Sequence, residues 1–330
     1  IPIDPVGLLP DAMSRELGKV GALTLRAALD AKGFPHAHNI HVVIPHGVSD
    51  LGVALAHAQM ARIAEGAILV DVVNRESIKS LEIFTGYVDE RINSNEHPAN
   101  PNTTVLGFFN AQPELKGKVF AFSAWEAFNR ILNEKASGIP VTAAYDTLGF
   151  NNLTANEKLL NKLHQQSYRP WGEECYDVFT HFNAMETLKN RKPRVLYISY
   201  GETDEWSHAG KYKSYLNAAN QLDKWLEEIW NFVQSDPQYK NNTTLFITSD
   251  HGRGDMVKEK WTSHGDKIEG ANQIWMAVMG PNTPALGEVK TPAQYYQKQF
   301  AQTIAHLMGY NFTAEHPVAD PIKSTKAISQ

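Results

Sequence analysis

Two apolar runs in the second half of the chain are each followed by a carboxylate and a histidine. The runs cover residues 195–200 and 244–248, and both are rich in the branched and aromatic residues that favour strands. The polar side chains that follow have the donor atoms of metal ligands: Asp204, His208, Asp250, His251 and, further along, His264. Groups at strand ends meet in the crevice at the carboxyl edge of an α/β sheet, where such sheets bind ligands. The sequence therefore predicts an α/β fold with a metal site at that edge.

The residue types and their spacing suit a transition metal. Two aspartates and three histidines are the donors of zinc or manganese sites, whereas calcium takes oxygen ligands. Asp204 and His208 are four residues apart, so a helical turn would place both on one face. Asp250 and His251 are adjacent, and a turn at Gly252 would let both reach one centre. Taken singly, each motif also fits a structural role, such as a helix cap or a surface histidine; their joint order is the stronger signal.

Strand-like and helix-like segments alternate along the rest of the chain. Predicted strands cover residues 40–44, 67–73, 119–122, 195–200, 244–248 and 273–279. Predicted helices cover residues 11–32, 51–65, 124–134, 154–166, 211–234 and 291–309, and one more runs to about residue 189. The helix over 211–234 has one apolar face that would cover the sheet: Tyr215, Ala219, Leu222, Leu226, Ile229 and Val233. This alternation favours a mostly parallel sheet with helices on both faces, and residues 40–73 predict one parallel strand–helix–strand unit.

Length and charge limit the classes of function. The chain of 330 residues is predicted to form a single domain over 1–330, with residues 140–190 as a covering or inserted region. A net charge of −5 without a run of Lys or Arg argues against a nucleic-acid-binding surface. No apolar stretch approaches the roughly 18 residues of a membrane span, and no signal-peptide pattern opens the chain. The lone Cys175 excludes an intramolecular disulfide. We therefore expect a small-molecule partner, and the sequence leaves the oligomeric state open.

The three motifs resemble those of the alkaline phosphatase superfamily. The resemblance rests on Asp-x-x-x-His after one strand, Asp-His-Gly after the next, and the following His-Gly, and it runs from residue 82 to residue 323. It is closest to the nucleotide pyrophosphatase/phosphodiesterase-like members and to uncharacterised phosphatase-like members. It implies a three-layer α/β sandwich, a two-metal centre, hydrolysis of phosphate esters, and a periplasmic or secreted location.

The resemblance also implies a role for each ligand. Asp204, His208 and His264 would hold one divalent ion, zinc or manganese, while Asp250 and His251 would hold the other. Two ions about 4 Å apart would activate a serine hydroxyl and neutralise charge on the transferring phosphoryl group. Water would then release the covalent phosphoenzyme. Activity would fall in acid, because the ligands must be neutral imidazoles and ionised carboxylates.

Residues 1–75 depart from the family pattern. The first strand of the family ends in an Asp followed by Gly, whereas the matching stretch here, residues 42–47, places His46 at that position. His46 would exchange a negative ligand for a neutral one, and Asp50 is a nearby substitute. Asp50 is less well placed, and His46 could equally be an ordinary loop residue.

The nucleophile segment departs as well. Relatives carry Ser or Thr before a turn that contains Pro, whereas residues 74–81 are shorter and contain no Pro. Ser77 is the candidate nucleophile, Ser80 is the fallback, and Asn95 is the candidate donor to a phosphate oxygen; each could also be a plain loop residue. Three explanations fit: a divergent active enzyme, a rebuilt N-terminal part, or a metal-binding protein that has lost catalysis.

We therefore expect a metal-dependent hydrolase that cleaves phosphomonoesters or phosphodiesters through Ser77. The alternative from another class is a catalytically impaired metal-binding or scaffold protein. A sulfatase would need a Cys/Ser-x-Pro-x-Arg context, which surrounds neither Ser77 nor Cys175, and a phosphomutase would need an inserted domain for which the chain has little room. Arg253 and Lys260 flank the ligands, where they either attract an anionic substrate or simply lie on the surface.

Overall fold

The computed structural model places a mixed β-sheet at the centre of the molecule. It describes residues 41–43, 66–71, 77–92, 94–254, 261–265, 267–268, 270–281, 283, 287–289 and 293–322. The strands among these residues are β1 (His41–Val43), β2 (Gly66–Asp71), β3 (Val119–Ser123), β4 (Val141–Ala143), β5 (Val195–Ser199), β6 (Thr243–Thr248), β7 (Met276–Met279) and β8 (Gly287–Val289). Their order across the sheet is β4-β3-β5-β2-β6-β7-β1-β8. Neighbours are parallel from β4 through to β6 and again between β1 and β8, whereas β7 runs antiparallel to both of its neighbours.

The central strands are buried along their whole length. Every residue of β3, β5 and β6 is buried, which is why these segments are mostly apolar and carry no charged residue. The strands predicted at residues 119–122, 195–200 and 244–248 are therefore present within a residue or two of the expected bounds.

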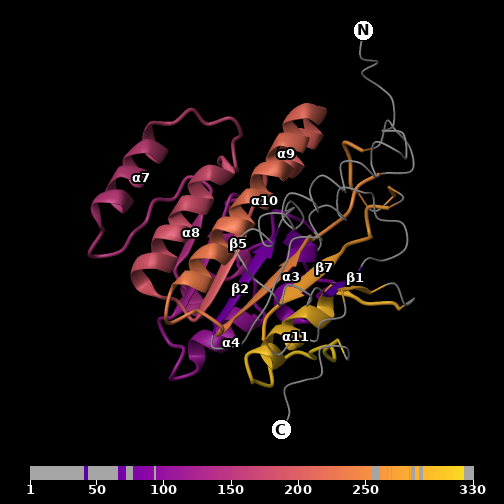
Figure 1. Ribbon diagram of the computed structural model, residues 1–330. Helices are drawn as coiled ribbons and strands as arrows, with labels where there is room; N and C mark the ends of the chain where they lie inside the picture. Colours follow the sequence, from indigo (N-terminus) through magenta and orange to yellow (C-terminus); the bar gives the residue numbers. More distant parts are fainter. Residues whose placement is uncertain are drawn as a thin grey trace.

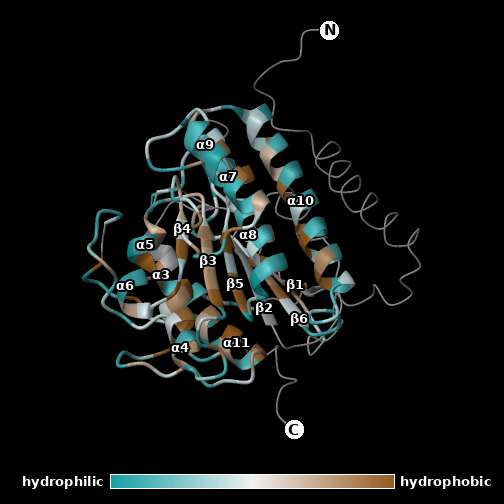
Figure 2. Ribbon diagram, turned by 90° about the vertical axis from the view of Figure 1, so that its left-hand side faces the viewer, coloured by the Kyte–Doolittle hydropathy of each residue, from teal (hydrophilic) through white to brown (hydrophobic). Residues whose placement is uncertain are grey.

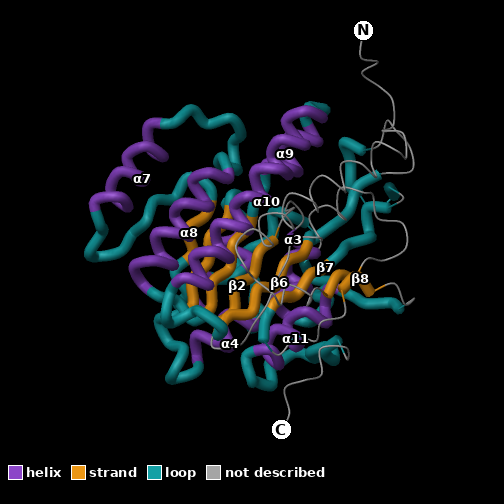
Figure 3. The backbone as a smooth tube through the Cα atoms, in the orientation of Figure 1, coloured by secondary structure: helices purple, strands orange, loops and turns teal. Residues whose placement is uncertain are grey.

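Helices pack against both faces of this sheet. The described helices are α3 (Ser77–Thr85), α4 (Val105–Ala111), α5 (Phe128–Ile131), α6 (Glu134–Ser137), α7 (Ala155–Gln166), α8 (Asp177–Arg191), α9 (Glu202–His208), α10 (Tyr212–Ser235) and α11 (Phe300–Leu307), with a 3-10 turn η2 (Gln297–Gln299) before the last. In Figure 1 and Figure 3 the strands form a layer among them.

Two hydrophobic clusters hold the helices to the sheet. Successive side chains of a strand point to opposite faces. On β3, Val119 and Ala121 join α3, α4, α5 and α11 in one cluster, whereas Phe120 and Phe122 join α8 and α10 in the other. Figure 2 shows the central strands mostly in hydrophobic colours, whereas α10 carries hydrophilic and hydrophobic residues in alternation along its length.

The helix α10 has the apolar face that its sequence predicts. It spans Tyr212–Ser235, and its buried residues include five of the six predicted ones together with Trp225: Ala219, Leu222, Trp225, Leu226, Ile229 and Val233. Tyr215, the sixth, is only partly buried. These residues pack on the strand side chains of the second cluster, so α10 covers the sheet as expected.

Several elements differ from the sequence prediction. The strands β1 and β2 are not neighbours, because β6 and β7 lie between them, so residues 40–73 do not form a simple parallel unit. The helix expected over 124–134 is divided into α5 and α6, since Asn133 adopts a left-handed conformation (φ 43°) and caps α6. The last α-helix begins at Phe300 rather than at residue 291, although it ends before Gly309 as predicted. The helices predicted over 11–32 and 51–65 lie outside the described residues.

The region over residues 140–190 supplies parts of the sheet and its cover. The strand β4 pairs with β3, the helix α8 packs on β3 and β5, and α7 packs on α8. The division of the chain into domains stays a prediction. Among the described helices, none combines the length and the hydrophobicity that crossing a bilayer requires.

The packing of α10 can be tested by shortening a fully buried side chain. Leu222 is 0% exposed, so Leu222→Ala should leave a cavity and lower the free energy of unfolding by about 2–5 kcal/mol. Urea unfolding followed by circular dichroism measures this change. The control is Asn217→Ala, at an exposed position of the same helix, which should change the free energy by less than about 0.5 kcal/mol. Equal effects of the two substitutions would contradict the described packing.

Candidate metal centre

Three neighbouring parallel strands end at the same level at one edge of the sheet. Asp71, the last residue of β2, pairs with Ser199 at the end of β5 and with Thr248 at the end of β6. The segments that leave β5 and β6 therefore start on either side of β2 at the carboxyl edge. This is the location that the strand pattern predicts for a ligand site.

The short helix α9 presents Asp204 and His208 from one face. It begins at Glu202, directly after β5 and Tyr200-Gly201, so the predicted helical turn is present. His208 Nε2 lies 3.2 Å from Asp204 Oδ2, as the four-residue spacing requires. The Asp204 side chain is fully buried, whereas 32% of the His208 side chain is exposed.

The loop after β6 presents Asp250 and His251, and both are buried. His251 Nδ1 lies 2.9 Å from the carbonyl oxygen of Gly252. Because a carbonyl oxygen only accepts, Nδ1 carries the proton and Nε2 carries the lone pair. That Nε2 lies 3.7 Å from Asp250 Oδ1 and 3.8 Å from Asp204 Oδ1. In metal-binding histidines, such a hydrogen bond from the ring nitrogen that does not bind the metal fixes the tautomer and the orientation of the imidazole.

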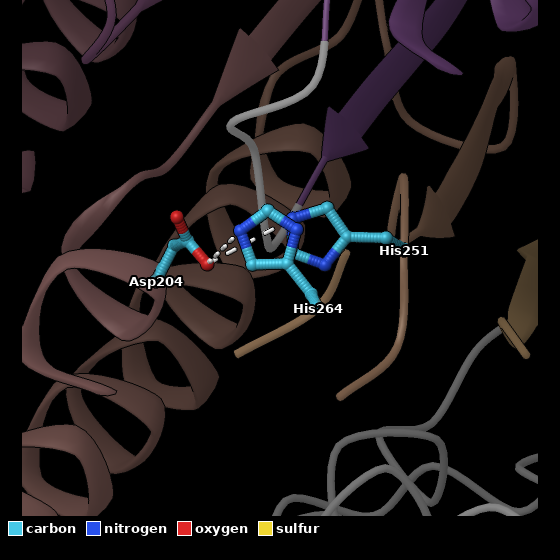
Figure 4. Close-up of side chains that lie close together, drawn as sticks. All are labelled: Asp204, His251 and His264. Atoms are coloured by element: carbon cyan, nitrogen blue, oxygen red, sulfur yellow. Dashed lines mark ion pairs between the residues drawn. The ribbon is translucent and has the colours of Figure 1, made fainter. Parts of the chain in front are cut away.

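His264 completes the cluster from the third motif. Its Nε2 lies 3.7 Å from Asp204 Oδ1 and 2.8 Å from His208 Nε2. Its ring stacks on that of His251, with the centroids 3.8 Å apart and the planes 11° from parallel. Figure 4 shows the carboxylate of Asp204 turned toward these two stacked rings. The structure thus brings together five of the predicted ligands, which come from three separate segments.

The donor atoms have nearly the spacing that one ion requires. One ligand atom from each of Asp204, His251 and His264 lies within 4.8 Å of the others. Tetrahedral zinc with bonds of about 2.0–2.1 Å separates its ligand atoms by about 3.3 Å. The 3.7 Å and 3.8 Å separations from Asp204 Oδ1 exceed this value by a few tenths of an ångström, so these residues fit a metal ion. His251 stands in this group, whereas the resemblance assigns it to a second ion; the division of ligands between two ions stays a prediction.

Arg253 lies against the same carboxylate and is not an exposed surface charge. Only 11% of its side chain is exposed, and its Nη2 forms an ion pair with Asp204 Oδ1. The same nitrogen donates to the backbone carbonyl of Asp204 at 3.2 Å, and Nη1 donates to that of Trp261 at 3.5 Å. The guanidinium therefore offsets the buried negative charge of Asp204. Lys260, the other predicted flanking cation, lies outside the described residues.

The strand order identifies a carboxylate that the sequence reasoning missed. The family pattern was matched to residues 42–47, but β1 lies near the edge of the sheet, separated from β2 by two strands. The strand between β5 and β6 is β2, and its last residue is Asp71. Asp71 therefore lies at the end of a central strand and is a candidate for the first-strand Asp of the family. The signal in the sequence was an apolar run, residues 67–70, followed directly by a carboxylate. His46 and Asp50 lie outside the described residues.

The structure shows where the backbone of each predicted catalytic or substrate-binding residue lies. Ser77 is the first residue of α3, and Ser80 lies in the same helix, so neither is in the loop that the sequence suggested. Asn95 lies in a turn, where its carbonyl accepts a hydrogen bond from Arg130 Nη2 at 3.0 Å. The roles of Ser77 and Asn95 stay predictions.

The site lies in the part of the chain that matches a known family. Residues 175–311 match the model of the metalloenzyme superfamily, and they include β5, α9, β6 and all five side chains around Asp204. This part of the chain is therefore similar in sequence to that superfamily. The resemblance to the alkaline phosphatase superfamily is confirmed at this level.

A known relative that aligns with most of the chain has low sequence identity to it. A Leptospira interrogans protein described as a 2,3-bisphosphoglycerate-independent phosphoglycerate mutase is 22% identical over 260 residues, or 70% of this chain and 46% of that protein. The chain thus spans less than half the length of that relative.

Two solved structures resemble this chain. A candidate sulfatase from Bacteroides thetaiotaomicron matches with a TM-score of 0.53 and 10% identity, over 76% of this chain and 72% of its own. A Vibrio parahaemolyticus protein of the alkaline phosphatase superfamily matches with a TM-score of 0.49 and 10% identity, over 76% and 67%. The first of these matches shows a common α/β fold, and at this identity it shows nothing of the reaction.

The loop that carries Asp250 and His251 depends on a glycine. A Cβ at Gly252 would lie 2.4 Å from the carbonyl oxygens of both Gly270 and Gln273. Gly252→Ala should therefore displace the loop, lower the free energy of unfolding by about 1–3 kcal/mol and reduce the zinc retained after dialysis. Thermal unfolding and elemental analysis measure the two effects.

The matched control is Gly265→Ala, beside His264. A Cβ at Gly265 would meet no atom within 4 Å, so this variant should keep the stability and zinc content of the parent protein. Equal zinc retention by the two alanine variants would show that the close approach at Gly252 does not shape the site.

Proposed function

We propose that this protein is a metal-dependent hydrolase of phosphate esters, either monoesters or diesters, with an alkaline-phosphatase-like three-layer fold. The observation that carries the proposal is the convergence of metal-ligand side chains on the fully buried carboxylate of Asp204. Aspartate and imidazole donors suit zinc best and manganese next. A small phosphate ester is the expected partner, because an anionic group would be drawn to such a centre.

The proposed centre takes two divalent ions, in line with the family resemblance. The ligands divide into Asp204, His208 and His264 for one ion and Asp250 and His251 for the other. Asp71 at the end of β2, or His46, would complete the second set. When bound, the ions supply the positive charge that lowers the pKa of a nucleophilic hydroxyl and neutralises the transferring phosphoryl group.

Ser77 is the proposed nucleophile. It begins α3, and the free N–H groups and dipole at a helix N-terminus favour negative charge beside it. Its hydroxyl oxygen would attack phosphorus as the ester oxygen leaves, and water would then hydrolyse the phosphoserine. Asn95 is the proposed donor to a phosphate oxygen.

Phosphoryl transfer within one substrate is a second candidate reaction. It is favoured by the Leptospira interrogans relative, whose description is that of a phosphoglycerate mutase. Such a reaction would use the same ligands and the same serine, but would return the phosphoryl group to the substrate rather than to water. The chain spans 46% of the length of that relative.

Two further alternatives have less support. A sulfatase shares the fold, as the Bacteroides thetaiotaomicron structure suggests, but Ser77 and Cys175 lack the sequence context that this chemistry needs. A catalytically impaired metal-binding or scaffold protein would keep the ligand cluster and show no turnover.

Hydrolysis is tested with aryl phosphate monoesters and diesters in the presence of added zinc or manganese. The parent protein should release the phenolate, and Ser77→Ala should lower kcat by at least about 10³-fold without loss of bound metal, because it removes only the nucleophile. Ser80→Ala is the control and should keep activity near that of the parent. Metal-loaded parent protein without turnover on any ester would favour the scaffold alternative.

Hydrolysis and transfer are separated by their products. Incubation of the metal-loaded protein with 3-phosphoglycerate should release inorganic phosphate and glycerate if water is the acceptor. Nuclear magnetic resonance of phosphorus distinguishes this outcome from isomerisation. Formation of 2-phosphoglycerate without free phosphate would replace the hydrolase proposal by the mutase reaction.

A further inference from the structure

The helix that carries Asp204 and His208 is too short to be stable alone. The helix α9 has seven residues, and isolated helices shorter than about 12 residues are marginal in water. Its N-cap is Gly201, which has no side chain to satisfy the first N–H groups. The position of α9, and with it the position of both ligands, must therefore come from its surroundings.

Asp177 supplies the missing cap from another helix. One carboxylate oxygen accepts the N–H of Gly201 at 2.7 Å, and the other accepts the N–H of Glu202 at 3.0 Å. Asp177 is 2% exposed, so these bonds are made away from solvent. Burial, and then the negative charge of Glu202, raise the pKa of Asp177, whereas the two N–H donors act in the opposite direction.

Glu202, the first residue of α9, in turn caps α8, the helix that carries Asp177. Its Oε1 accepts the N–H of Asp177, the first residue of α8, at 3.0 Å. Its Oε2 accepts from Trp206 Nε1 at 3.0 Å, which fixes the side chain along α9. The N-cap of α8 is Tyr176, and its side chain makes no capping bond within the described residues. The first turns of α8 and α9 thus cap each other.

The helix α8 is anchored to the sheet. It packs on β3 and β5, and its Ala184, Met185 and Leu188 belong to the hydrophobic cluster on that face. The space beside Gly201 is also filled, because a Cβ there would lie 2.5 Å from Glu174 Oε2. Because α8 is fixed on the sheet, the two caps also fix the position of α9 relative to the sheet.

We propose that Asp177, together with Glu202, is a positioning residue of the metal centre: it holds α9 so that Asp204 and His208 face His251 and His264. The inference rests on the proposed metal site and adds to it residues that touch neither metal nor substrate. Groups that orient metal ligands from behind usually affect metal affinity by about 10–100-fold.

The test compares Asp177→Asn and Glu202→Gln with the parent protein, using cobalt(II) as the probe. An amide at residue 177 accepts one N–H bond and turns its own N–H groups toward the second donor, so one cap bond is lost. Both variants should weaken cobalt binding, by about 10–100-fold for Asp177→Asn, in competition with a chromophoric chelator. Their visible cobalt spectra should also change, because the ligand geometry is altered.

The control is Glu157→Gln in α7, a residue that pairs with Arg191 at the other end of α8. Glu157 is also a fully buried carboxylate that caps a helix, accepting the N–H of Thr154 at 2.7 Å, and it pairs with Arg191. It supports no proposed ligand, so this variant should lower the unfolding temperature while keeping the cobalt affinity and spectrum of the parent. This separates a positioning role from a general loss of stability.

Each outcome decides between the proposals. Folded Asp177→Asn with the affinity and spectrum of the parent would overturn the positioning role and leave the metal site intact. If Asp177→Asn does not fold, Glu202→Gln, at a partly exposed side chain, decides by the same two readouts. Parent protein that binds no cobalt would overturn both proposals. Parent protein that binds cobalt but cleaves no ester would remove the hydrolase proposal, while the affinities still decide the positioning role.

Discussion

The buried carboxylate of Asp204 is the constraint on which the site depends. A carboxylate with no exposed surface is costly unless positive charge or hydrogen-bond donors surround it. Here the side chains of Arg253, His208, His251 and His264 all approach it, and they come from segments on both sides of β2. Asp204 Oδ1 is shared by the guanidinium and by two imidazoles, so the same atom can serve either an internal cation or a bound one. A divalent ion would meet the need of this carboxylate for positive charge and would take its ligands from residues that are already gathered.

The scaffold places Asp204, His208, Asp250 and His251 close to the ends of two strands, whereas His264 follows within the segment between β6 and β7. Because β2, β5 and β6 are parallel neighbours that end at one level, α9 and the Asp250 loop start close to each other. Each segment is then held by a local device. The helix α9 is capped by Asp177 of α8, and the loop after β6 passes so close to Gly270 and Gln273 that only glycine fits at residue 252. Asp204, His208, Asp250 and His251 are therefore held by contacts with the buried core.

Family and fold limit the chemistry but do not select one reaction. The superfamily match covers residues 175–311, which contain the ligand cluster, whereas residues 1–75 and the nucleophile segment, residues 74–81, carry the departures from the family pattern. Relatives described as phosphoglycerate mutases and structures described as sulfatases share parts of the sequence or the fold. One fold supports several reactions when the nucleophile and the substrate contacts change. For this reason the proposed reaction depends on Ser77 and on the second set of ligands more than on the architecture.

The sequence by itself determined the central strands, the α10 face and the ligand motifs. These features are local: an apolar run, a step of three and four, or Asp and His four residues apart can be recognised without knowing the neighbours. Only the tertiary structure decided that β2, and not β1, lies between β5 and β6, which places Asp71 at the end of the central strand. It alone joined Asp177 to Glu202, 25 residues away, and turned Arg253 inward to Asp204. Strand neighbours and buried charge partners depend on which surfaces pack together across the whole chain, and no local pattern contains that information.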